Sequence, residues 1–201
     1  MKTIDLEYEP NNLLGPARRA RIRAFEKWLR GFWERPVRLP ASYVEHITTF
    51  HGGVPGKKCF RTASGRVRVL GRFFNFLEEA DIKPPILPTW RPWGMGQDIR
   101  LDYRVAEYLD NEHWAIRIDQ FHLLPFAGLD TAGHDCRAMN EYDLLCFDYD
   151  AEDEPAVVTW DFHESWEDRA ITEVVATSFA EFLPMLYRCK NRVTKEAINT
   201  F

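Results

Sequence analysis

Two continuous apolar runs separated by an acidic segment are the feature that most restricts how this chain can fold. Leu144–Phe147 and Val157–Trp160 are short, uncharged and apolar, which is the length and composition of buried strands. Asp148–Pro155 joins them with acidic residues and a proline, as is typical of a surface turn. The two runs therefore predict an antiparallel β-hairpin with a long acidic tip.

Other segments predict helices and a second hairpin. In Ala17–Trp33 apolar residues recur at spacings of three and four, and basic residues lie between them. Ala41–Phe50 predicts a shorter helix that Pro40 opens. Phe179–Arg188 predicts a third, in which Ser178 and Glu181 fit a capping box. Strands are predicted over 59–62 and 66–70. This mixture of signals favours a single α+β domain.

Length, cysteines and the N-terminus bound the class of protein. A chain of 201 residues with 45% hydrophobic residues is long enough to bury one core without disulfides. No apolar run is long enough to cross a bilayer, and Met1–Glu7 lacks the apolar centre of a signal peptide. We therefore expect a cytoplasmic protein whose four cysteines are reduced thiols: Cys59, Cys136, Cys146 and Cys189.

Charge is distributed unevenly along the chain. Residues 1–100 hold 18 Lys and Arg against 10 Asp and Glu, a balance of +8, whereas residues 101–201 hold 8 against 21, a balance of −13. Between Glu141 and Asp168 there are eleven acidic residues and no basic one. This pattern indicates two electrostatically distinct faces or internal pairing of the halves, and solvated loops are the alternative.

Three sets of segments carry a family resemblance through their order and spacing. The first is Leu39–Tyr43 with Phe50–Pro55, the second is Leu124–Ala127 with Gly133 and Leu144–Asp148, and the third is Pro155–Trp160 with His163, Glu164 and Ser178–Leu183. Together they resemble the SMI1/KNR4 family of the SUKH superfamily over residues 20 to 188. Residues 81–115 and 134–142 are longer than the family pattern, so 81–115 is expected to be an insertion, and 190–201 a loose tail.

The resemblance implies one domain over residues 1–201, with helices packed on a mixed, mainly antiparallel sheet. The family includes many bacterial immunity proteins, which neutralise toxins that are often nucleases, and fungal cell-wall regulators. It thus implies a non-enzymatic protein-binding module, an immunity protein first and a regulatory or scaffold protein without a toxin second. The motif residues are expected to have structural roles: Leu39, Pro40, Tyr43, Gly52, Gly53, Gly133, Trp160, Phe179 and Phe182.

Catalytic chemistry has weaker support in the sequence. A metal-dependent hydrolase would need ligands from a scattered set whose spacing fits no zinc motif: His122, His134, Asp135, Cys136, Cys146 and His163. Cys59 with His51 lacks the sequence context of an activated nucleophile. We therefore expect no catalytic residue, no metal and no cofactor.

The acidic tip is the leading candidate for the partner-binding surface. Its carboxylates could enter the basic cleft of a toxin domain and imitate phosphates: Asp148, Asp150, Glu152, Asp153 and Glu154. Trp90 and Trp93 are candidate aromatic anchors. A basic helix opens the opposite possibility of nucleic-acid binding, through Arg18, Arg19, Arg21, Arg23, Lys27 and Arg30. The net charge of −5 and the lack of a nucleic-acid-binding motif favour a solvated helix face instead. A membrane partner is not expected, and the oligomeric state is left open.

Overall fold

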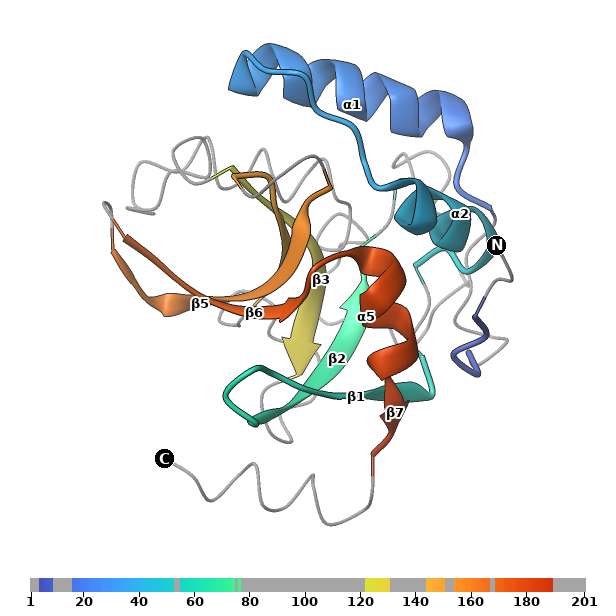
Figure 1. Ribbon diagram of the computed structural model, residues 1–201. Coiled ribbons are helices and arrows are strands. Elements are labelled where there is room, and N and C mark those ends of the chain that lie inside the picture. The colour runs from blue at the N-terminus through green and yellow to red at the C-terminus, as the bar shows by residue number, and fades with distance from the viewer. Residues whose placement is uncertain are drawn as a thin grey trace, which may run out of the picture.

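The computed structural model (Figure 1) describes residues 4–8, 16–52, 55–74, 76, 122–130, 144–150, 154–166 and 169–189. The predicted insertion 81–115 and tail 190–201 lie outside these residues. So do Trp90, Trp93, Gly53, Gly133, Glu152 and Asp153.

The described chain forms three helices and one sheet. The helices are α1 (Arg19–Trp33), α2 (Ala41–Thr49) and α5 (Phe179–Met185). The strands are β1 (Lys57–Arg61), β2 (Val67–Phe73), β3 (Leu123–Asp130), β4 (Leu144–Asp148), β5 (Ala156–Trp166), β6 (Arg169–Ala176) and β7 (Tyr187–Arg188). Their order in the sheet is β6-β5-β4-β3-β2-β1-β7. Each neighbouring pair is antiparallel. The predicted α+β class is confirmed.

The central hairpin forms as the two apolar runs predict. β4 and β5 pair antiparallel, with Leu144 opposite Trp160 and Phe147 opposite Val157. All four of these residues are buried. Because successive side chains point to opposite faces of a strand, the continuous run of buried residues in β4 means that both faces of the sheet are covered here.

Helices α1 and α2 follow from their periodicity. In α1 the positions three and four apart are buried: Ile22, Phe25, Leu29 and Trp33. The helix is capped by Glu34, which follows its last residue and takes the left-handed conformation at φ 50°. α2 begins directly after Pro40, whose fixed φ suits a helix entry. The segment after α2 turns at Gly52, where φ is 64°, a conformation that glycine adopts without strain.

Helix α5 is short because Ser178 caps its N-terminus and Pro184 limits its C-terminal end. The Ser178 hydroxyl accepts a hydrogen bond from the backbone N–H of Glu181 at 3.2 Å, which is half of the predicted capping box. The Glu181 carboxylate accepts its own hydrogen bond from the hydroxyl of Thr177. Pro184 lacks a backbone N–H, and the helix ends at Met185 rather than at the predicted Arg188.

The core is an aromatic cluster between α2, α5 and the sheet. The ring of Phe179 lies 5.1 Å from the ring of Tyr43 on α2, 5.6 Å from Phe126 on β3 and 5.9 Å from Phe147 on β4, between ring centroids. These three contacts are edge-on, the favoured geometry for such pairs. In Figure 1, α1 is the outermost layer, and α2 lies between α1 and α5.

The sheet is curved, so that the turn between β1 and β2 lies next to β6. The Arg66 guanidinium in this turn forms a 2.8 Å ion pair with the Glu173 carboxylate, although three strands separate β2 from β6 in the sheet. The Ser64 backbone N–H donates to the same carboxylate at 2.6 Å. Burial would raise the pKa of Glu173, but hydrogen bonds from Ser64, Thr62 and Arg66 outweigh it and lower the pKa to about 2. Glu173 therefore links strand β6 to the turn between β1 and β2.

We expect Glu173→Gln to lower the free energy of unfolding at neutral pH by about 2 kcal/mol, because a charge-assisted set of hydrogen bonds is lost. The pKa is lower in the folded state, so the carboxylate stabilises the fold fully above the ordinary value of 4.5. That stabilisation disappears as the pH falls from 4.5 towards about 2. Urea unfolding between neutral pH and pH 2 tests this. A difference between wild type and variant that does not shrink on acidification contradicts the assignment.

The cysteines correct one expectation. Cys59 on β1 and Cys189, directly after β7, form a disulfide with their Cα atoms 5.3 Å apart. Cys59 also lies opposite Tyr187 in the β1–β7 pairing, so this pairing brings the two sulfur atoms within reach. The prediction that all four cysteines are free thiols is therefore wrong. Cys146 is a free, buried thiol, and Cys136 lies outside the described residues.

Thiol titration of the freshly purified, denatured and unreduced protein measures this directly. With four cysteines in the chain and two of them paired, we expect at most two reactive thiols. Reduction should raise the count to four, and Cys189→Ser should raise the unreduced count by exposing the Cys59 thiol. A count of four without reduction would show that the bond does not form.

Candidate protein-binding surface

The acidic end of the β4–β5 hairpin is only partly a free surface. Asp150 is exposed, but its carboxylate accepts from the Arg35 guanidinium at 3.5 Å and contacts Nδ1 of His122. The Asp148 carboxylate accepts the backbone N–H of Asp150 at 3.0 Å, which shapes the turn. Glu154 is exposed. Asp150 is thus used within the molecule, whereas Asp148 and Glu154 keep uncompensated charge in the described part of the tract.

The segment after α1 holds this acidic end in place. Arg35 also donates to the backbone carbonyl of Tyr149 at 2.9 Å, and the Tyr149 hydroxyl donates to the carbonyl of Arg38 at 2.9 Å. Trp33, the last residue of α1, packs edge-on against the rings of His122 and Tyr149, each 5.5 Å away. Burial is the main cause that raises the pKa of Tyr149, so its hydroxyl stays protonated and donates. The acidic end is therefore a positioned surface.

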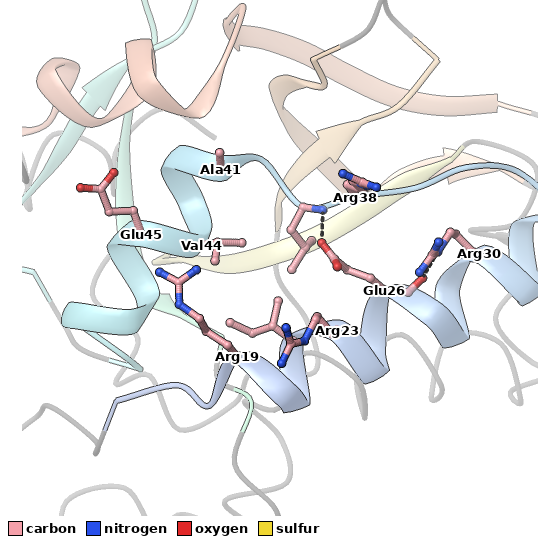
Figure 2. A pocket seen from close by; sticks show the side chains of 10 residues that line it. Arg19, Arg23, Glu26, Arg30, Arg38, Ala41, Val44 and Glu45 are labelled. Carbon is pink, nitrogen blue, oxygen red and sulfur yellow. Dashed lines mark hydrogen bonds between the residues drawn. The ribbon is translucent and has the colours of Figure 1, made fainter. Parts of the chain in front are cut away.

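A basic groove lies beside it, between α1, the connection 34–40 and α2 (Figure 2). Its volume is about 790 Å³. We define the groove by its lining: Arg19, Ile22, Arg23, Glu26, Arg30, Arg38, Leu39, Ala41, Val44 and Glu45. Ile22 and Leu39 are buried, and the four arginines are exposed. A size within the range of ligand sites and a lining that mixes apolar and charged side chains suit a binding surface.

One hydrogen bond fixes the shape of the groove. The Glu26 carboxylate on α1 accepts from the backbone N–H of Leu39 at 2.9 Å, as the dashed line in Figure 2 shows. This bond attaches the connection to α1 and positions Arg38 and Leu39 in the groove lining. The Arg30 side chain donates to the backbone carbonyl of Glu26 at 3.2 Å.

The buried titratable groups serve the fold. His46 on α2 forms a 2.6 Å hydrogen bond with the Tyr8 hydroxyl, and burial lowers the pKa of His46 to about 4, so it is neutral at pH 7. Nε2 of His51 accepts the backbone N–H of Phe76 at 2.8 Å. Burial raises the pKa of Cys146 well above its ordinary value, which keeps the thiol protonated. Cys59 is in the disulfide, so it cannot act as a nucleophile with His51.

Within the described ranges, no three His, Cys, Asp or Glu side chains come together as a metal site would require. His134, Asp135 and Cys136 lie outside those ranges. No helix in the same residues is long and apolar enough to cross a membrane.

The family-motif residues that can be placed lie mostly in the interior. Leu39, Tyr43, Trp160, Phe179 and Phe182 are buried. Trp160 donates its indole N–H to the Ser165 hydroxyl at 3.0 Å. Pro40 is the residue before α2. These buried positions suit the expected structural roles, and of the five only Leu39 also lines the groove.

Sequence reasoning missed the groove. The basic helix was identified from the sequence, but its charged face was interpreted as a solvated surface. The available signal was spacing, because Arg19, Arg23, Glu26 and Arg30 follow one another at intervals of four, three and four residues and so share one face of α1.

The fold and these surfaces define an α+β domain with helices on a curved antiparallel sheet and with two charged surfaces side by side. The model of the SMI1/KNR4 family (SUKH-1) matches residues 16–185, so the chain belongs to this family, as its motifs predicted. No curated protein and no solved structure matches the chain.

Proposed function

We propose that this chain is a non-enzymatic protein-binding module that acts as an immunity protein and neutralises a toxin by direct binding. The observation that carries the proposal is that buried titratable groups and exposed charged groups have different uses. Buried titratable groups are used to hold the fold, as in His46 with Tyr8, whereas uncompensated charge is gathered on the acidic end and in the basic groove. Membership of the SUKH-1 family supports the immunity role, because the family includes many immunity proteins.

Two buried groups with shifted pKa values are used by the fold, which fits a binding role. A catalytic acid, base or nucleophile needs both a shifted pKa and access to substrate. His46 and Cys146 have shifted pKa values, but both side chains are buried. Neither lines the groove.

The partner that suits the acidic end is a toxin domain with a basic cleft. Clefts of this kind occur in enzymes that bind polyanions, and carboxylates at the rim of an inhibitor accelerate encounter with them. Asp148 and Glu154, with Glu152 and Asp153 between them in the sequence, are the proposed contacts, and Asp150 positions the turn through Arg35 and His122. Trp90 and Trp93 remain proposed aromatic anchors.

The proposed compartment is the cytoplasm, where the targets of nuclease toxins are found. The Cys59–Cys189 disulfide is the observation against it, since disulfides are rare in reducing compartments. The thiol titration described above therefore also bears on the compartment.

Protection of living cells tests the function. Toxin domains encoded beside the gene would be expressed from a regulated promoter, with and without this chain. We expect growth to be restored for one of them, with loss of protection when Phe179→Ala removes a core ring. If none of the toxin domains is neutralised while the chain is folded and abundant, the function would instead be that of a regulatory or scaffold protein.

A further inference from the structure

Three of the four arginines of the groove have no internal use that explains their position, whereas Arg30 donates to Glu26. Within the described part of the chain, the guanidinium groups of Arg19, Arg23 and Arg38 form no ion pair or hydrogen bond. Arg19 and Arg23 are four residues apart on α1, so like charges face each other at a spacing that destabilises a helix. Figure 2 shows both side chains extending from α1 on the side of α2. An anion at this place would relieve the repulsion.

The N-terminal half of α1 adds to the same field. The start of a helix carries partial positive charge, and acidic side chains in the first turn usually compensate it. α1 has no acidic residue in its first turn and begins with Arg19. The groove lining has four arginines against two glutamates, which leaves a net charge of +2 (4 − 2). Positive charge therefore accumulates on an exposed site of this otherwise acidic chain.

The floor of the groove selects among anions. Half-buried Val44, with the edges of the buried Ile22 and Leu39, gives it an apolar surface between the arginines, which a bare phosphate would not use. A peptide segment with acidic side chains and one apolar side chain uses both parts. Carboxylates accept paired hydrogen bonds from guanidinium groups, and the apolar side chain is removed from water on the floor.

The neighbouring acidic end disfavours a long polyanion. Arg38 lines the groove, and its carbonyl accepts from Tyr149, the residue before Asp150. A nucleic acid that continued past Arg38 would approach the acidic end to which Tyr149 belongs, and its carboxylates repel phosphates. A short acidic segment beside a basic surface fits both sites at once.

From these observations we propose that the basic groove binds an acidic peptide segment with an apolar anchor, supplied by the same protein partner whose basic surface faces the acidic end. The inference rests on the proposed function only for the identity of the partner. The chemistry of the groove stands on its own lining.

The test compares two charge reversals on α1. Arg23→Glu changes a residue that lines the groove, whereas Lys27→Glu makes the same change at an exposed position of the same helix outside the lining. The probes are short labelled peptides with several Asp or Glu residues and one Leu or Phe, the same peptides with Lys in place of the acids, and an oligothymidylate. Fluorescence anisotropy at low salt gives the affinities, and thermal melts check folding.

We expect the acidic peptides to bind the wild type in preference to the other probes. Arg23→Glu should weaken this binding by about tenfold or more, and Lys27→Glu by less than about threefold. Three results would overturn the inference: no binding of acidic peptides to the wild type, an equal loss in both variants, or tighter binding of the oligothymidylate that Arg23→Glu abolishes. Toxin protection is measured separately in cells. If the protein does not protect cells but the peptides bind as expected, the toxin function is rejected and the groove inference stands.

Discussion

Phe179→Ala is expected to lower the free energy of unfolding by about 3–5 kcal/mol, among the largest effects of any single substitution in this chain. Phe179 is fully buried, and its ring contacts rings from α2, α5 and the strands β2, β3 and β4. Truncation leaves a cavity in the middle of this cluster, which the surrounding rings can fill only in part. Chemical denaturation followed by circular dichroism measures the loss.

The matched control lies on the same helix. Met185 is 37% exposed, and we expect Met185→Ala to change the stability by no more than about 0.5 kcal/mol. Where Phe179→Ala fails to fold, Phe179→Leu keeps part of the ring volume and should fall between the two. Equal stability of the Phe179→Leu and Met185→Ala variants would contradict the central role of this ring.

Neutralising the free carboxylates of the acidic end is expected to slow association with a basic toxin domain by about tenfold or more at low salt. The variant combines Glu152→Gln, Asp153→Asn and Glu154→Gln. Exposed charges at the rim of an interface act chiefly on encounter, so dissociation should change little. The difference should shrink as salt rises, because ions screen exposed charges beyond about 8 Å at physiological ionic strength. Stopped-flow association at several salt concentrations measures it.

Asp150 is the internal control for this experiment. The sequence groups it with the other acidic residues, but in the structure its carboxylate is already paired with Arg35 and His122. We therefore expect Asp150→Asn to slow association by less than about threefold, and to cost about 0–1 kcal/mol of stability as an exposed pair. If the triple variant associates at the wild-type rate at low salt, the tip is only a solvated turn.

Local pattern was sufficient for the parts of the fold that depend on neighbouring residues. The β4–β5 hairpin follows from two apolar runs and the turn between them, and α1 from its periodicity. The boundary of α5 was misplaced because Pro184 limits the helix more than its apolar pattern suggests.

Contacts between residues that are far apart in the sequence could not be predicted from local patterns. The disulfide links cysteines 130 residues apart, and no local pattern indicates that these two pair. Glu173 meets Arg66 across 107 residues only because the sheet curves. The groove requires the connection to fold back so that the N–H of Leu39 reaches Glu26. No periodicity or motif in the sequence indicates any of these three contacts.

We propose that the protein neutralises a toxin by binding to it and not by altering it. The most direct measurement is titration of the purified toxin's activity with this protein, followed by recovery of the toxin. We expect the activity to fall linearly to zero at a fixed stoichiometric ratio. The toxin should return intact in mass and fully active after separation in denaturant and refolding. Complete inactivation by a small fraction of one equivalent, or a toxin recovered with altered mass, would show turnover and contradict the account.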